Sequence, residues 1–206
     1  ELFWPDLDPD AARNNLNVAI YGLRQALRAA RPAFSHVLYR DDCYLINPAL
    51  YVWVDAEAFE QHYAAAQAQE QSDLKEAVRQ YRAAEALYQG EYMEEDRYEE
   101  WLISRRQRLE TSYLELLDRL IGYCYDQKDD AVCIALCHKV LLVDPCREQA
   151  HRSLMCCYYR QGQPYLAVRQ YHLCAERLAD ELDVSPAQRT MDLYEQIRNN
   201  EPSACA

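Results

Sequence analysis

The sequence predicts a mostly α-helical fold in two parts: a short segment with one helix and a β-hairpin, then a longer stack of paired helices. Three observations predict it. Apolar residues form one helical stripe within residues 9–30, β-forming runs flank Asp41-Asp42, and similar residues recur 34 positions apart later in the chain. We place the two domains at 1–54 and 55–200, and we expect residues 201–206 to form a frayed tail.

The first helix is predicted over residues 9–30. Asp8 is a typical N-cap, a proline occupies the first helical position, and Pro32 would end the helix. No acidic residue lies between positions 11 and 31, although the whole chain has a net charge of -12. The apolar stripe, with spacings of three and four, consists of Leu16, Ile20, Leu23 and Leu27.

A β-hairpin is predicted directly after this helix. Residues 36–40 and 43–47 are rich in β-forming side chains, and Asp41-Asp42 between them are turn residues. Residues 51–54 have the composition of another short strand, and Asp55 would cap the next helix.

Paired helices are predicted from residue 55 onward because similar residues recur at a fixed offset. Cys133, Cys137 and Val140 each precede a matching residue by 34 positions, namely Ala167, Tyr171 and Cys174. A helix–turn–helix period of 34 residues is the tetratricopeptide signature. An earlier copy at Ala77, Tyr81 and Ala84 implies an insertion around 91–113, and a last helix over 187–198 would cap the superhelix.

Composition and motifs argue against catalysis and membrane insertion. The chain has only 4 glycines and contains no GxGxxG, Walker A, HExxH or GxSxG motif. Its five histidines have no nucleophile or carboxylate partner at a recognisable spacing. No apolar run approaches the roughly 18 residues that a membrane span needs. We therefore expect no enzyme, no cofactor and no membrane partner.

The 9 cysteines are predicted to be reduced thiols of a cytoplasmic protein. Cys133 and Cys137 do not follow a zinc-binding spacing, so we expect core thiols and no metal. Adjacent Cys156 and Cys157 point to different sides of a helix, so at most one should be in the core. Free surface thiols are predicted at Cys43 and Cys205.

The first helix also carries a polar face that suits nucleic acid. Asn14, Asn15 and Asn17 are poor interior helix formers, each costing roughly 0.5–0.7 kcal/mol relative to Ala. Asn and Arg pair with base edges in the major groove, and Arg also holds phosphates. A helix followed by a hairpin is the layout of a winged helix, with the hairpin as the wing. A solvated helix packed on a small sheet explains the same pattern, and both interpretations stay open here.

Longer motifs resemble one known family, the bacterial transcriptional activators of the antibiotic-regulatory-protein type. Residues 2–9, 12–16 and 23–27 resemble the recognition-helix half of their DNA-binding domain. Seven later segments resemble their tetratricopeptide-like activator domain: residues 86–91, 98–101, 105–109, 113–117, 143–145, 148–155 and 182–186. The family's winged helix would begin upstream of Glu1, so residues 1–54 correspond to its C-terminal half. Asp41-Asp42-Cys43 stand where the family's wing carries Gly, which puts DNA contact by the wing tip in doubt.

The resemblance implies sequence-specific transcriptional regulation, and activation in particular. Promoter DNA with direct repeats would be one partner, and RNA polymerase, a regulatory domain or a second copy of the chain would be others. The residues predicted to contact DNA are Arg13, Asn14, Asn17, Val18, Tyr21, Arg24 and Arg28.

Protein contacts are predicted on the helical repeats. Stacked repeats form a concave surface, and aromatic residues commonly anchor interfaces. The residues proposed to bind protein are Tyr92, Tyr98, Trp101, Tyr125 and Tyr159. Acidic residues within 94–100 form either a solvated face or a docking surface for a basic partner.

The alternative function is an interaction scaffold of tetratricopeptide type that does not bind DNA directly. Residues 54–206 hold 28 acids and 17 bases, whereas residues 1–53 hold 6 acids and 5 bases. Such an acidic second part would repel a nucleic-acid backbone. The net charge therefore favours the scaffold, and the Asn- and Arg-rich helix favours DNA binding.

Overall fold

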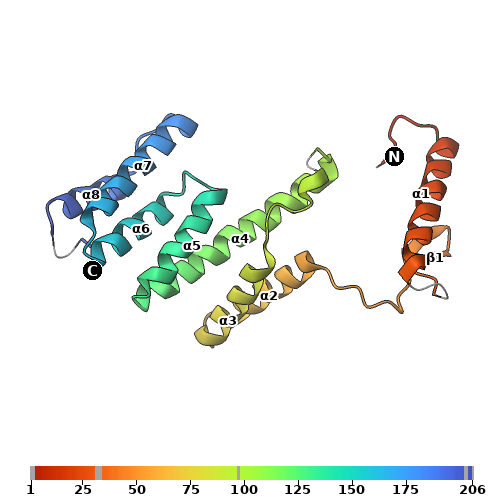
Figure 1. The fold of residues 1–206 in the computed structure, drawn as a ribbon, viewed down its shortest axis with the longest axis horizontal. Helices are drawn as coiled ribbons and strands as arrows, with labels where there is room; N and C mark the ends of the chain where they lie inside the picture. Colours follow the sequence, from red (N-terminus) through yellow and green to blue (C-terminus); the bar gives the residue numbers. More distant parts are fainter. Residues whose placement is uncertain (1–2, 31–33, 97, 202–203, 206) are drawn as a thin grey trace. The chain divides into compact units, whose positions relative to one another are not determined.

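The computed structural model describes residues 3–30, 34–96, 98–201 and 204–205. The chain forms two compact units, unit 1 over residues 1–53 and unit 2 over residues 54–206. Each unit has the secondary structure that the sequence predicts for its fold class: a helix with a hairpin in unit 1, and helical repeats in unit 2 (Figure 1).

Unit 1 consists of α1 (Pro9–Ala30), β1 (Val37–Arg40) and β2 (Cys43–Ile46). The Asp8 carboxylate accepts hydrogen bonds from the backbone N–H groups of Asp10 at 3.1 Å and Ala11 at 3.0 Å, so the predicted N-cap is confirmed. Pro32, predicted to end the helix, lies outside the described residues.

The predicted hairpin is confirmed, with β1 and β2 antiparallel and Arg40 opposite Cys43. Its two-residue turn puts Asp41 at φ 52° and Asp42 at φ 59°. A two-residue hairpin turn of type I′ requires positive φ at both positions, and Asp tolerates this conformation better than most non-glycine residues.

The strand predicted over residues 51–54 is wrong. These residues have no regular secondary structure, and Tyr51 is 90% exposed. A strand needs a hydrogen-bonded neighbour, and in the described part of the chain β1 and β2 pair only with each other. The β-forming composition of this segment therefore gives an extended connection and no strand.

Unit 1 buries little of its own apolar surface. Val37 is the only buried residue among those described in this unit. On the predicted apolar stripe of α1, Ile20 and Leu27 are half-buried, whereas Leu16 and Leu23 are exposed. The hairpin alone does not provide a core for this helix.

Unit 2 is a succession of helices that pack mainly on their neighbours in sequence, as in a repeat protein (Figure 1). The short 3-10 helix η1 lies in the predicted insertion, and α4 is the longest helix because the repeat helix is extended at its start. The elements are α2 (Asp55–Gln69), α3 (Leu74–Leu87), η1 (Glu94–Asp96), α4 (Glu100–Asp126), α5 (Asp130–Val143), α6 (Glu148–Arg160), α7 (Pro164–Leu182) and α8 (Gln188–Arg198).

Small residues stand where paired helices meet. Ala77, Cys133 and Ala167 occupy equivalent repeat positions on α3, α5 and α7, and each is 0% exposed. A larger side chain there would hold the two helices of a pair apart. This close packing explains the repeating pattern found in the sequence.

Two apolar clusters meet at α6. The first includes Leu116, Leu120 and Leu154 and extends from α2 to α6, whereas the second includes Met155, Leu193 and Ile197. Cys157 belongs to the first cluster and Cys156 to the second, so both are buried. The expectation that at most one of this pair lies in the core is wrong, because apolar residues cover α6 on both sides.

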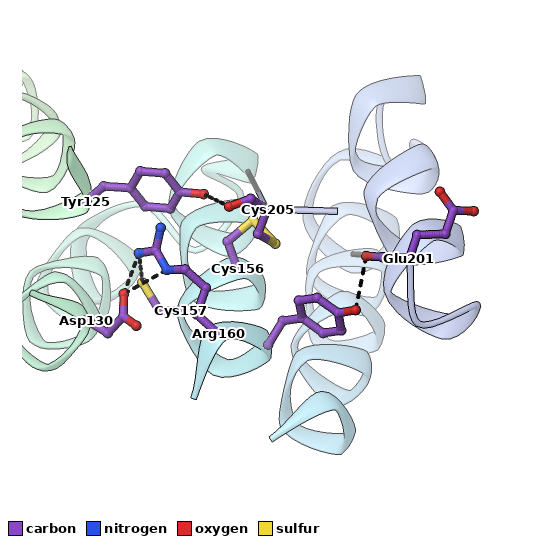
Figure 2. Close-up of a disulfide and its surroundings, with 8 residues drawn as sticks. Tyr125, Asp130, Cys156, Cys157, Arg160, Glu201 and Cys205 are labelled. Carbon is purple, nitrogen blue, oxygen red and sulfur yellow. Dashed lines mark hydrogen bonds and ion pairs between the residues drawn. A yellow bond between two sulfur atoms is a disulfide. The ribbon is translucent and has the colours of Figure 1, made fainter. Parts of the chain in front are cut away.

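The end of the chain packs against α6 instead of fraying at Ala204 and Cys205. Ala204 is buried, and Cys205 forms a disulfide with Cys156 (Figure 2). Cys205 is therefore not the free surface thiol that the sequence predicts. Cys43 is exposed and free, as predicted.

In the described part of the chain, no helix is both long enough and apolar enough to cross a membrane.

Candidate nucleic-acid interface and docking surfaces

An exposed stripe runs along α1 on the side opposite its apolar stripe. Successive spacings of three and four residues place its members on one face of the helix. Val18 and Tyr21 are 64% and 65% exposed. This stripe, called the α1 stripe below, consists of Asn14, Val18, Tyr21, Gln25 and Arg28.

Four of the seven residues predicted to contact DNA belong to the α1 stripe. Gln25 was not among them, although its spacing from Tyr21 and Arg28 could have identified it. Its side-chain amide donates a hydrogen bond to the Tyr21 hydroxyl at 2.9 Å. The stripe therefore offers two amides, one aromatic ring, one aliphatic side chain and one cation to a partner.

Asn17 and Arg24 lie against the hairpin. The Arg24 guanidinium donates hydrogen bonds from Nε and Nη2 to the Val37 carbonyl oxygen at 3.3 and 3.0 Å. It also lies 5.5 Å from the centre of the Tyr44 ring, and the Tyr44 hydroxyl donates to Asn17 Oδ1 at 2.8 Å. These contacts hold the hairpin on the helix.

Arg13 is exposed near the hairpin tip, where the charge is mixed. The Tyr39 hydroxyl donates to Asp42 Oδ1 at 2.9 Å. This bond to a carboxylate raises the pKa of Tyr39, and the charge of Arg13 opposes the shift. Asp41 and Asp42 at the tip would repel phosphates.

Two of the aromatic residues predicted to bind protein hold the end of the chain in this structure. The Tyr125 hydroxyl donates to the Cys205 carbonyl oxygen at 3.4 Å, and the Tyr159 hydroxyl donates to the Glu201 carbonyl oxygen at 3.0 Å (Figure 2). The Arg160 guanidinium lies 3.9 Å from the centre of the Tyr125 ring and is ion-paired with Asp130.

The other three aromatic residues lie in or beside the insertion. Tyr98 is 96% exposed. Trp101 is 43% exposed, and its indole N–H donates to Glu99 Oε2 at 3.0 Å. Tyr92 is half-buried, with the Arg105 guanidinium 5.9 Å from its ring centre. These three residues are better placed for contact with a partner than Tyr125 and Tyr159.

A polar groove of about 510 Å³ lies between α4, α6 and α8. Charges of both signs line it, including Asp118, Arg152 and Asp192. Asp118 Oδ2 accepts from Arg147 Nη2 at 2.6 Å, and this bond raises the pKa of Arg147. Asp118 Oδ1 is buried and has no hydrogen-bond partner among the described residues.

The buried thiols of unit 2 contact one another. The hydrogen bond with Cys137 is the largest cause that raises the pKa of Cys133, to about 12, and the bond with Cys157 opposes it. Burial raises the pKa of Cys174 to about 12 as well. Cys133 and Cys174 are therefore protonated near neutral pH and behave as small core residues.

Comparison with known proteins identifies the repeat domain. The model of the bacterial transcriptional activator domain family matches residues 54–198. The chain is also similar to a solved structure of Mycobacterium tuberculosis EmbR in complex with a low-affinity phosphopeptide, with a TM-score of 0.68 and 19% sequence identity. That similarity covers 99% of this chain and 54% of the EmbR chain. A search of curated proteins gives no significant match.

Proposed function

The chain belongs to the bacterial transcriptional activator domain family, and we propose that it is part of a cytoplasmic transcriptional activator that binds promoter DNA through unit 1 and other proteins through unit 2. The observation that carries the DNA-binding role is the α1 stripe, which contains no carboxylate in a chain of net charge -12. Direct repeats at a promoter would each receive one copy of α1.

The chemistry of the α1 stripe fits the major groove, which is wide enough to admit an α-helix. The amides of Asn14 and Gln25 can pair with adenine edges, and Val18 and Tyr21 can contact thymine methyl groups. Arg28 can hold a guanine edge or a phosphate, and Arg13 a phosphate. We assign Asn17 and Arg24 a positioning role, since both are bonded to the hairpin.

The exposed Leu16 and Leu23 support the same proposal. In the winged helix that the resemblance implies, further helices cover the apolar side of the recognition helix. Their presence would bury Leu16 and Leu23 and leave the α1 stripe exposed to DNA. This arrangement explains why one helix carries an uncovered apolar face and a polar face free of acids.

Selection of binding sites from random duplex DNA by the full-length protein tests the DNA-binding role. We expect a repeated motif to be enriched. The double variant Asn14→Ala/Arg28→Ala should bind that motif at least about thirtyfold more weakly, because each of the two lost base contacts costs about 1–3 kcal/mol.

The matched control is Gln107→Ala/Arg177→Ala, which removes the same chemical groups from exposed positions of unit 2. It should leave the selected motif and the affinity unchanged. Equal weakening on every DNA sequence would assign Asn14 and Arg28 to phosphate contacts only. If the folded full-length protein enriches no motif, the interaction scaffold becomes the better proposal.

The scaffold remains the second candidate because of unit 2. This unit holds 28 acidic and 17 basic residues, and a groove with charges of both signs lies on its surface. Both features suit binding of a protein partner. RNA polymerase, a regulatory domain or a second copy of the chain would be such a partner. In a transcriptional activator, both roles belong to one molecule, with DNA bound by unit 1 and a protein by unit 2.

A further inference from the structure

A second cavity, of about 350 Å³, lies among the start of α2, the end of α3, the insertion and α4. Its floor is apolar and aromatic. Phe59 and Leu109 are 2% and 4% exposed, and Leu87, Tyr88 and Tyr92 pack against the same cluster. We call it the insertion cavity.

The rim of the insertion cavity is acidic. Asp55, Glu91 and Glu94 line it, and no Lys or Arg is among its described lining residues. The chain then continues through Glu95, Asp96, Glu99 and Glu100, which are all exposed. A cation bound at the rim would meet the carboxylates of Asp55 and Glu94.

Arg106 anchors residues 91–93, which line the cavity. Its side chain, only 10% exposed, forms an ion pair with Glu91 Oε1 at 3.1 Å. It also donates to the backbone carbonyl oxygens of Tyr92 at 3.1 Å and Met93 at 3.3 Å. Met93 has φ 50°, a strained value for a residue with a side chain, and these bonds stabilise that turn. The cavity is thus preformed.

The charges select against an anionic ligand. The N-terminus of α2 lies at the rim, and such a terminus attracts anions. Asp55 and Glu57 occupy its first turn, however, and already supply the negative charge that the helix dipole favours. Nucleic acid or free phosphate at the entrance would meet the carboxylates of Asp55 and Glu94.

We propose that the insertion cavity is a docking site for a basic peptide segment of a partner protein, which inserts one large apolar side chain between Phe59 and Tyr92 while its flanking Lys or Arg residues meet the acidic rim. This inference rests on the proposed protein-binding role of unit 2 and names the chemistry of the partner. Apolar anchors in a pocket with charges at its edge are the usual arrangement of an interface hot spot.

The probe is a short fluorescent peptide with a central Phe flanked by Lys on both sides, added to the full chain while fluorescence anisotropy is measured. We expect saturable binding. Replacing the central Phe of the probe by Ala should weaken binding about tenfold or more, because burying a Phe side chain contributes about 1.5–3 kcal/mol. Equal binding of the two peptides would show that nothing enters the cavity and would overturn the proposal.

Two variants of the protein separate the cavity from bulk charge. Asp55→Asn/Glu94→Gln should weaken binding roughly threefold to tenfold, whereas Glu176→Gln/Asp180→Asn on α7 removes the same charge elsewhere and should have little effect. Equal effects of the two double variants would mean non-specific attraction to an acidic protein. Gly90→Phe should weaken binding, since Gly90 lines the cavity and an added Cβ there meets no heavy atom within 4 Å, so a bulky side chain can be placed beside the cavity without a clash.

The oligomeric state provides the last test. If the unmodified chain self-associates and Gly90→Phe makes it monomeric, the occupant is a second copy and the proposed partner is wrong. None of these experiments uses DNA. Failure of the site selection therefore leaves this proposal standing, and failure of peptide binding leaves the DNA-binding role intact.

Discussion

His151 on α6 is a buried polar residue whose hydrogen bonds fix its tautomer. Its ring is 1% exposed, with Nε2 2.9 Å from the Pro145 carbonyl oxygen and Nδ1 2.6 Å from the Gln170 side-chain nitrogen. A carbonyl can only accept, so Nε2 carries the proton and Nδ1 accepts from the Gln170 amide. The neutral ring thus joins α6 to α7 and to the α5–α6 connection.

Acid should destabilise unit 2 through this residue. Burial lowers the pKa of His151 below its ordinary value of 6.5, and the Pro145 bond with the charges of Glu148 and Asp144 only partly opposes it. As pH falls through 6.5, the unfolded chain binds a proton that the folded state excludes, so the free energy of unfolding decreases. Urea unfolding of the chain at pH 7.5 and 5.5 measures this loss.

The variants assign the effect to His151. His151→Asn should show a smaller difference between the two pH values, whereas His138→Gln, which removes an exposed histidine, should retain the full difference. The same pH dependence in all three proteins would contradict the role assigned to His151.

Arg24 shows what sequence reasoning can and cannot find at the scale of one residue. Its position on α1 follows from the predicted helix, and its residue type suits DNA. The sequence does not reveal that the Val37 carbonyl oxygen lies 3.0 Å from its guanidinium. That contact depends on how the hairpin folds back on the helix, which spacing along one helix does not encode.

At the scale of elements, the disulfide between Cys156 and Cys205 holds the chain end on α6. The two cysteines are 49 residues apart, and closing such a loop in the unfolded chain contributes at most about 4 kcal/mol. We expect a reducing agent or Cys205→Ser to lower the free energy of unfolding toward this limit. Urea unfolding with and without dithiothreitol measures the change.

Cys43→Ser is the control, since this thiol is exposed and unpaired. It should unfold as the unmodified chain does and remain sensitive to dithiothreitol. Since the cytoplasm keeps most thiols reduced, the bond would form there only under oxidising conditions. A midpoint insensitive to dithiothreitol in the oxidised protein would show that the tail adds no stability.

Elements with a local signal were predictable from sequence, and elements that depend on a distant partner were not. Asp8 and the apolar stripe predict α1, and the 34-residue offset predicts α5 to α7. Residues 51–54 have strand composition but no neighbouring strand. No sequence pattern predicts the disulfide between Cys156 and Cys205, because their contact depends on how α7 and α8 return the chain to α6.

At the scale of the whole molecule, the two units differ in the size of their hydrophobic cores. Unit 2 has two apolar clusters, whereas unit 1 has one buried residue among those described. A two-stranded hairpin is marginally stable at best by itself. Unit 2 therefore carries the stability of this chain.

Residues 54–206 should consequently fold alone. We expect this fragment to unfold cooperatively, with a midpoint in urea close to that of the full chain, as measured by circular dichroism. A peptide of residues 3–53 should show little stable structure under the same conditions. A fragment 54–206 that aggregates or lacks a cooperative transition would contradict this division of stability.

The covalent link at the chain end also changes how the protein responds to mechanical force. Tension applied at the C-terminus passes from Cys205 directly to Cys156 and bypasses α7 and α8, which lie between them in sequence. The 49-residue segment between the two cysteines would be about 170 Å long when fully extended, and it cannot extend under this force until the disulfide is reduced. An ATP-driven unfoldase that pulls on this end would therefore apply force to α6 before α7 and α8. It would have to translocate two disulfide-linked segments of the chain side by side.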